Sequence, residues 1–347
     1  MARFLQLHVL TSYPPSNLNR DDLGRPKTAK MGGTERLRIS SQSLKRNWRV
    51  SDIFQSALSS HLGTRTKMLG VNIYASLIEA EVSEKKAKDW AKLISSQFGK
   101  SKKDNELEIE QLVHISPEEQ SAIEDLVETI VRENRAPEDN ELDLLRRTGM
   151  AADIALFGRM LAAKPAHNVE AACQVAHAIS VHSIVIEDDY FTAVDDLNNH
   201  DVDAGASHIG ETGFASALFY SYICINNELL LENLNGDRDL AEKTVRSLVE
   251  VIAKVSPTGK QNSFGSHAYA SYIRAERGNQ QPRSLSVAFL KPVDQSADDY
   301  LSAAIHALEA QATNFDKVYG SCATSTSTLN TSTGEGSLDE LLDFASQ

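Results

Sequence analysis

Alternating apolar and polar residues predict strands at several places along the chain. Side chains two residues apart lie on the same face of a strand, so alternation indicates one buried face and one more polar face. The first such segment, from Arg3 to Leu10, is followed by a loop full of turn-forming residues. We predict four strands in this way, over residues 3–10, 214–226, 263–274 and 284–290.

Apolar residues spaced three and four apart predict a second set of elements, which are helices. One of them begins at Ser116-Pro117-Glu118-Glu119, a pattern like the capping box in which the first and fourth residues satisfy each other's backbone. The predicted helices cover residues 83–97, 117–134, 169–182, 240–255 and 297–313. The order strand, helix, strand, helix, strand, with long insertions, indicates an α+β domain of ferredoxin-like type.

Two insertions and a terminal tract interrupt this order. Residues 62–149 are mostly amphipathic helix and predict a helical subdomain. Residues 183–219 hold two extended arms around a polar turn rich in Asn, Asp and Gly, which predicts a projecting hairpin. Residues 319–347 combine a Ser/Thr-rich tract, which we expect to be flexible, with a short acidic helix.

Composition places the chain among folded globular proteins. Its 347 residues are 41% hydrophobic and 24% charged, which is enough for a sizeable core. No apolar run approaches the roughly 20 residues that span a bilayer, and the N-terminus is too short and too quickly polar for a secretory signal. The three cysteines are widely spaced without a CxxC motif, which fits a reducing cytosol and argues against a disulfide framework or a zinc finger. We therefore expect a cytoplasmic protein with no membrane partner.

Positive charge is concentrated in one segment of an acidic chain. The segment Asn19–Arg49, the basic window, contains nine basic and three acidic residues, whereas the whole chain carries a net charge of −13. Phosphate is the default partner of such a segment. A solvated basic face is the alternative, and charge alone does not decide between them. If copies of the chain stack, their acidic surfaces repel one another unless the acidic face of one copy meets the basic face of the next, which is a head-to-tail contact.

The parts of the basic window suit a phosphate chain. Gly32-Gly33 permits a tight turn, and the alternation that follows it predicts a short strand with Arg36 and Arg38 on one face. Ser40-Ser41-Gln42 has the composition of a helix N-cap, where unpaired backbone N–H groups can bind an oxyanion. Lys45 and Arg49 lie one turn apart on the predicted helix, so each can meet a successive phosphate.

Motifs of common enzymes are absent from the sequence. There is no GxGxxG after a strand, no GxxxxGK[ST], no HExxH and no GxSxG. The carboxylate pairs Asp21-Asp22 and Asp195-Asp196 are adjacent in sequence, and neighbouring aspartates in extended chain point to opposite faces. His177 and His182 are five residues apart, which is poor helical geometry for a shared metal. We expect no cofactor, no metal and no catalysis, with a metal-dependent nuclease using Asp21 or Asp22 as the alternative.

Several motifs, taken in order, resemble a known family. They are NRDD (19–22), GG (32–33), RISSQSLKR (38–46), DIAL and GRM (153–160), AHAI (176–179), FTAVDDL (191–197) and HIG (208–210). In these residues the chain resembles the CasC family, the backbone subunits of the type I-E CRISPR Cascade complex. The similarity extends from the first strand to about Asn226, and it is most specific in RISSQSLKR and FTAVDDL.

This resemblance implies a hand-shaped protein with an RRM-like palm, a helical finger insertion and a thumb hairpin. It divides the chain into palm (1–61, 150–182 and 220–318), finger (62–149), thumb (183–219) and tail (319–347). It also implies that copies polymerise along a CRISPR RNA beside other Cascade subunits, while the guide pairs with a target DNA strand. The thumbs would kink the guide at regular intervals. Related backbone proteins of type III effectors cut RNA with a palm aspartate, and this keeps the nuclease alternative open.

The resemblance also assigns roles to particular residues. The set that would contact guide phosphates is Arg20, Lys27, Ser40, Gln42, Lys45 and Arg49. Three further residues, Met160, Phe191 and Thr192, would pack at the kinked nucleotide. The finger differs from that of some members of the family, in which one helix is basic. The corresponding residues here are acidic (Glu138, Asp139, Glu141 and Asp143). We therefore expect any contact of the finger with DNA at the lysines Lys100, Lys102 and Lys103.

Overall fold

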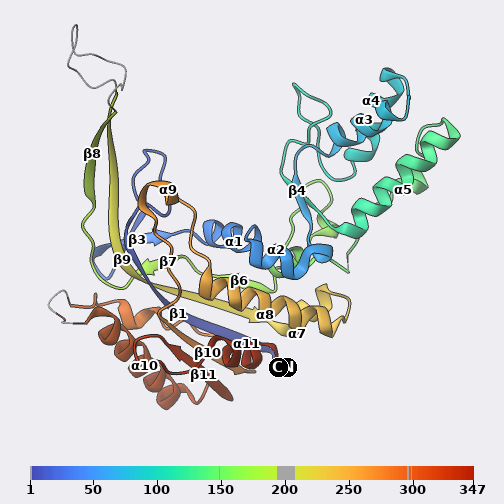
Figure 1. Ribbon diagram of the computed structural model, residues 1–347. Coiled ribbons are helices and arrows are strands. Elements are labelled where there is room, and N and C mark those ends of the chain that lie inside the picture. The colour runs from blue at the N-terminus through green and yellow to red at the C-terminus, as the bar shows by residue number, and fades with distance from the viewer. Residues whose placement is uncertain (1, 148, 194–207, 295–296, 298) are drawn as a thin grey trace, which may run out of the picture.

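The computed structural model describes residues 2–147, 149–193, 208–294, 297 and 299–347. A long hairpin rises at one side of the molecule and a helical subdomain rises at the other (Figure 1). Helices α1, α2 and α8 lie between and below these two projections, and the main sheet lies beneath them. The shape therefore has an open side bounded by the hairpin and the subdomain.

The main sheet is antiparallel in its described pairings. Its strands follow the order β11-β10-β1-β9-β7-β3-β2, and β6 and β8 pair with other parts of β9. A smaller sheet joins β4 and β5 in the subdomain. The bounds of the strands are β1 Phe4–Ser16, β2 Thr28–Met31, β3 Thr34–Ile39, β4 Thr64–Thr66, β5 Val113–Ile115, β6 Cys173–Val175, β7 Ala178–Ser180, β8 Glu187–Ala193, β9 His208–Asn226, β10 Tyr272–Gly278 and β11 Ser325–Asn330.

Helices of very different length surround the sheets. The α-helices are α1 Ser41–Arg49, α2 Asp52–Leu58, α3 Leu69–Glu79, α4 Glu84–Ser95, α5 Pro117–Glu133, α6 Ala152–Phe157, α7 Asn227–Asn233, α8 Arg238–Lys254, α9 Gln261–Phe264, α10 Tyr300–Tyr319 and α11 Leu338–Ser346. Short 3₁₀ segments are η1 Ser59–His61, η2 Asp139–Leu142, η3 Pro165–His167 and η4 Ser286–Phe289.

Helices cover both faces of the main sheet. The alternation in β1 places Leu5, Leu7 and Val9 in a core shared with α1, α2, α6, α8 and α11. Leu10 faces the other way and packs in a second core with α10 and η4. Since both faces are buried, the strand ends and the loops are the parts left for binding.

A group of polar residues lies on the α10 side of β1 and β10, and two of them, His8 and Glu276, are fully buried. We call it the Glu276 network; it comprises His8, Arg274, Glu276 and Arg283. Arg274 Nε donates to Glu276 Oε1 at 2.7 Å, and His8 Nε2 lies 3.6 Å from Glu276 Oε2. Burial lowers the pKa of His8. Burial alone would raise the pKa of Glu276, but its contacts with His8 and the two arginines outweigh this and lower it.

The helical subdomain between β4 and α6 has a hydrophobic core of its own. Leu77 of α3, Ile94 of α4 and Ile130 of α5 are fully buried there. The predicted capping box at the start of α5 is present, because Ser116 Oγ accepts from Glu119 N and Glu119 Oε2 accepts from Ser116 N. A separate core lets this subdomain act as one body against the sheet.

The predicted hairpin is formed by β8 and the first part of β9. These strands pair antiparallel from Glu187↔Phe214 to Ala193↔His208. At its base, Asn17 Nδ2 donates to Gly213 O at 2.9 Å, and Arg25 Nη2 lies 3.0 Å from Asp188 Oδ1. The loop around Asn17 and Arg25 therefore holds the base of the hairpin.

Many of the predicted elements are confirmed. The strands at 3–10 and 214–226 correspond to β1 and β9, and the helices at 83–97, 117–134, 240–255 and 297–313 correspond to α4, α5, α8 and α10. The mixed helix and strand class is also confirmed. The turn at Gly32-Gly33 joins β2 to β3 with φ of 60° and 81°, angles that favour glycine.

The predicted helix over residues 169–182 is wrong. This segment contains the short strands β6 and β7, which pair with β9. Its apolar spacing fits a helix face, but β9 is long enough to offer backbone partners on both sides of Ala176, whose N–H donates to Tyr222 O at 2.9 Å. Tertiary pairing has overridden the local pattern.

Two further strand predictions needed correction. The strand predicted over 284–290 is replaced by η4, because side chains bind the backbone that a strand would use: Tyr220 Oη accepts from Leu285 N, and Arg36 Nη2 donates to Phe289 O. The strand predicted over 263–274 begins only at Tyr272, and α9 lies before it.

The Ser/Thr-rich tract is part of the sheet, contrary to the flexible segment we expected. It contains β11, which pairs with β10 from Tyr272↔Asn330 to Arg277↔Ser325. Threonine favours strands, so a neighbouring unpaired edge is enough to order it. The predicted acidic tail helix is confirmed as α11.

Candidate nucleic-acid interface

Helix α1 begins at the capped turn that the sequence indicates. Ser40 Oγ accepts from Ser43 N at 3.3 Å, and Asn19 Oδ1 accepts from Ser40 N at 2.9 Å. Ser40 is buried, whereas Gln42 is exposed. The Ser40 hydroxyl is thus engaged in capping, and the exposed donors at this end belong to Gln42 and the residues after it.

A cavity of about 380 Å³ opens beside α1, and we call it the cationic cavity. It joins four of the predicted RNA-binding residues, Gln42, Lys45, Arg49 and Met160. The complete lining is Gln42, Lys45, Arg46, Arg49, Arg65, Gln111, Leu112, His114, Phe157, Gly158, Arg159 and Met160. Lys45 Nζ lies 5.8 Å from the centre of the Phe157 ring, which supports the amine at the cavity wall.

Arg49 is tied to a buried carboxylate at the edge of this cavity. Its Nη1 lies 3.7 Å from Oδ2 of Asp153, which is fully buried on α6. The same carboxylate binds His114 Nε2 at 2.8 Å and accepts from Gly63 N at 2.9 Å. Gly63 directly precedes β4 and His114 lies in β5, the two strands that connect the subdomain, so Asp153 of α6 joins the subdomain to the rest of the molecule. Arg49 therefore has less freedom than Lys45 to meet a phosphate.

A second buried ion pair strengthens this junction. Arg159 Nη1 donates to Glu119 Oε2 at 2.6 Å, and both side chains are almost inaccessible to solvent. Arg159 also donates to the carbonyl oxygens of His114, Arg146 and His167. Removing one member of such a pair leaves a buried charge without a partner, so loss of either residue would destabilise the junction.

A profile of the CT1975-like protein family matches residues 5–344. The chain belongs to the CT1975-like protein family. No curated protein matches it.

Two solved structures resemble this CT1975-like chain along nearly its whole length. A chain from a "CRISPR RNA-guided surveillance complex, pre-nicking" is 28% identical with a TM-score of 0.84, and the match covers 99% of this chain and 100% of that chain. A chain from a "CRISPR RNA-guided surveillance complex" is 23% identical with a TM-score of 0.74 and the same coverage, a likeness that concerns the fold alone. The predicted similarity to subunits of CRISPR surveillance complexes is confirmed.

The other predicted palm residues lie on the hairpin side of α1. Lys27 N donates to Asn19 O, and Asn19 Oδ1 accepts from Ser40 N at the start of α1. Asn19 therefore connects the backbone of Lys27 to the N-terminus of this helix. Arg20 is exposed in the preceding loop. Arg36, which we had placed beside Arg38 on the strand face of the basic window, is completely buried and donates to Ser180 O at 2.8 Å. Arg36 is therefore a structural residue.

The aspartate that we considered for catalysis closes a turn. Asp21 Oδ1 accepts from Leu23 N at 3.0 Å and from Arg25 N at 2.9 Å. Asp22 is exposed beside it. In the described part of the chain, no group of three His, Cys, Asp or Glu side chains is placed to hold a metal ion.

The predicted hairpin residues lie apart from the cationic cavity. Phe191 and Thr192 are exposed on β8, on the projection that faces the subdomain across the open side (Figure 1). A side-chain carbon at Gly210, opposite Phe191, would lie 2.3 Å from its ring, so this glycine makes room for the aromatic. The predicted carboxylate pair Asp195-Asp196 lies outside the described residues.

The subdomain lysines are partly neutralised by neighbouring acids. Lys102 forms an ion pair with Glu108, and Lys92 Nζ lies 3.0 Å from Glu106. Lys100 and Lys103 are exposed, with no ion pair to any described residue. They are the cations of this set that stay available for a polyanion.

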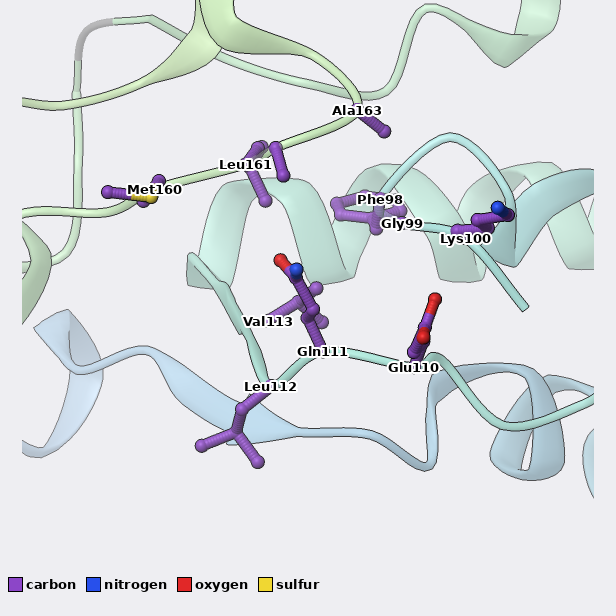
Figure 2. A pocket seen from close by; sticks show the side chains of 11 residues that line it. Phe98, Gly99, Lys100, Glu110, Gln111, Leu112, Val113, Met160, Leu161 and Ala163 are labelled. Carbon is purple, nitrogen blue, oxygen red and sulfur yellow. The ribbon is translucent and has the colours of Figure 1, made fainter. Parts of the chain in front are cut away.

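Lys100 also lies at the end of a second cavity, of about 230 Å³ (Figure 2). Phe98, Val113 and Leu161 form its apolar wall, and the Gln111 side chain points toward its interior. The cavity shares Met160, Gln111 and Leu112 with the cationic cavity. The two cavities therefore lie next to each other at the junction.

Sequence reasoning missed several residues of this site. Arg46 belongs to the basic window, but no pattern in the sequence distinguishes it from the other cations there. Arg65 and His114 come from the connecting strands of the subdomain, and no local pattern links either of them to α1.

Within the described residues, no helix combines the length and the apolar character needed to cross a bilayer.

Proposed function

We propose that the chain is a CRISPR RNA-binding backbone subunit of a Cascade surveillance complex, of the type I-E CasC kind. The observation that carries this proposal is the cationic cavity, where Lys45, Arg46 and Arg65 gather on a chain with a net charge of −13. Membership of the CT1975-like family and similarity to chains of CRISPR RNA-guided surveillance complexes support it.

In this proposal the cavity holds phosphates and does not read bases. Lys45 and Arg46 each neutralise one backbone phosphate, and the Gln42 amide adds a neutral donor. Contacts of this kind position a nucleic acid without carrying sequence information, so any guide can be bound. The bases stay free to pair with a target DNA strand.

The architecture suggests how copies assemble in the cytoplasm. The sheet with its helices is the RRM-like palm, the subdomain is the finger, and the β8–β9 hairpin is the thumb. The hairpin of one copy would reach the guide on the next copy, where Phe191, Thr192 and Met160 pack at a kinked nucleotide. Contacts of this head-to-tail kind generate an open helix along the guide, which other Cascade subunits would cap.

We propose that the subunit is not an enzyme. The Asp21 carboxylate already accepts two backbone N–H groups, which fits a structural role. A cleavage assay with magnesium and RNA paired to the guide tests this directly. Cleavage that disappears in Asp21→Asn or Asp22→Asn would establish the nuclease alternative.

The salt dependence of RNA binding tests the proposed contacts. For a single strand, the logarithm of the association constant falls with log salt by about 0.7 per neutralised phosphate. The double variant Lys45→Ala/Arg46→Ala should therefore flatten the slope by about 1.4. Lys243→Ala, an exposed lysine on α8, is the control and should leave it unchanged. An unchanged slope in the double variant would remove these residues from the RNA contact.

A further inference from the structure

The ring of His177 forms a hydrogen bond with an arginine and not with an acidic residue. Its Nδ1 lies 3.0 Å from Nη1 of Arg38 on β3. A guanidinium can only donate, so Nδ1 must accept, and the proton of the neutral imidazole is then on Nε2. The side chain is exposed, so this Nε2–H is a donor at the surface.

The charges that act on this imidazole are all positive. Burial lowers the pKa of His177, and the positive charges of Arg38 on β3 and Lys27, just before β2, lower it further. Among the described residues, neither cation forms an ion pair with an acid. Arg25 and Arg49 of the same basic window do have such partners, Asp188 and Asp153. The cluster of Lys27, Arg38 and His177 thus lacks an internal counter-ion.

This cluster continues the proposed RNA contact beyond α1. Arg38 N donates to Lys27 O at 2.8 Å, and Asn19 links Lys27 to the N-terminus of α1 through two hydrogen bonds. Lys27 is therefore connected to the same end of α1 whose Gln42 lines the cationic cavity. A strand held in the cavity that continued past Gln42 would reach Lys27, Arg38 and His177 next.

We propose that Lys27, Arg38 and His177 form a second phosphate site, and that His177 takes up a proton from solvent when the phosphate binds. A proton on Nδ1 turns this atom from acceptor to donor, so the bond to Arg38 breaks. Arg38 Nη1 and both imidazole N–H groups can then donate to phosphate oxygens. The phosphate supplies the negative charge that the cluster lacks, which favours the protonated imidazole. This site rests on the proposed function.

The proposal predicts that RNA binding strengthens as pH falls. In the free protein His177 is neutral at pH 7.5, because its pKa lies below the ordinary value of 6.5. If binding is coupled to uptake of one proton, the dissociation constant falls by at most about tenfold per pH unit. The extra contact should also steepen the salt slope by about 0.7 at the lower pH.

The test measures binding of a single-stranded RNA of mixed sequence to the full chain between pH 6 and 8, at several salt concentrations. His177→Gln keeps a neutral donor but cannot take up a proton, so it should bind like wild type at pH 8 and lose the strengthening at pH 6. His61→Gln, an exposed histidine on η1, is the matched control and should keep the strengthening. Circular dichroism at both pH values checks that each variant is folded.

The outcomes separate this site from the proposed function. Salt-dependent RNA binding whose pH dependence survives in His177→Gln overturns the second phosphate site and leaves the function standing. Absence of salt-dependent binding at every pH overturns the function itself. A loss of pH dependence confined to His177→Gln supports both.

Discussion

Replacement of Asp153 should destabilise the protein strongly, because its buried carboxylate contacts three separate segments of the chain. It binds His114 Nε2 at 2.8 Å, accepts from Gly63 N at 2.9 Å, and lies 3.7 Å from Arg49 Nη1. Replacing Asp153 with alanine removes all three contacts at once. We expect the subdomain to lose its fixed position against α1.

The size of the effect follows from the burial of these partners. Each buried donor that is left without an acceptor costs about 1–3 kcal/mol. Breaking a buried ion pair by removing one partner costs about 3–5 kcal/mol. Since solvent reaches His114 and Arg49 from the cationic cavity, we expect Asp153→Ala to lower the free energy of unfolding by about 3 kcal/mol.

Urea unfolding followed by circular dichroism measures this change. Asp153→Asn keeps an oxygen that can accept from Gly63 N and should lose less stability than Asp153→Ala. Asp89→Ala, an exposed aspartate on α4, is the control and should change stability by less than about 0.5 kcal/mol. If Asp153→Ala also stays within that range, the junction does not depend on this carboxylate.

Two further predictions concern the fold. The pKa values of both His8 and Glu276 are lowered on folding, so both groups stabilise the fold fully above pH 6.5. The free energy of unfolding should fall as pH drops below 6.5, because of His8, and fall further below pH 4.5, because of Glu276. Urea midpoints that do not change between pH 7 and pH 4 would contradict this. Gly32→Ala should be far more destabilising than Gly33→Ala in the same assay, because a side-chain carbon at Gly32 would lie 1.6 Å from Leu290 O, whereas Gly33 faces open space. Equal losses would show that only the positive φ matters.

Local patterns predicted the elements whose signals are local. The capping box of α5, the Gly32-Gly33 turn and the alternation of β1 are each settled by a few neighbouring residues. The predicted helix over 169–182 failed because its local pattern was ambiguous, and pairing with β9, distant in sequence, determined its structure. The Ser/Thr-rich tract failed for the same reason, since the edge of β10 orders it.

The residues of the candidate site also divide into those that a local pattern identifies and those that only the packing of distant segments brings together. Sequence reasoning selected Gln42, Lys45 and Met160, and the structure brings these three together in one cavity. It did not find Arg65 or Asp153, whose positions depend on how the subdomain packs against the rest of the molecule. Charge counting also included Arg36, which is completely buried, because a buried and an exposed arginine look alike in a sequence.

In the proposed function, the cations beside α1 hold a ribose-phosphate chain without reading its bases. The most direct measurement is the salt dependence of binding for two single-stranded RNAs of equal length and unrelated sequence. We predict the same dissociation constant and the same steep salt slope for both. A shallow slope, or a preference of more than about tenfold for one sequence, which corresponds to about 1.4 kcal/mol, would contradict the claim.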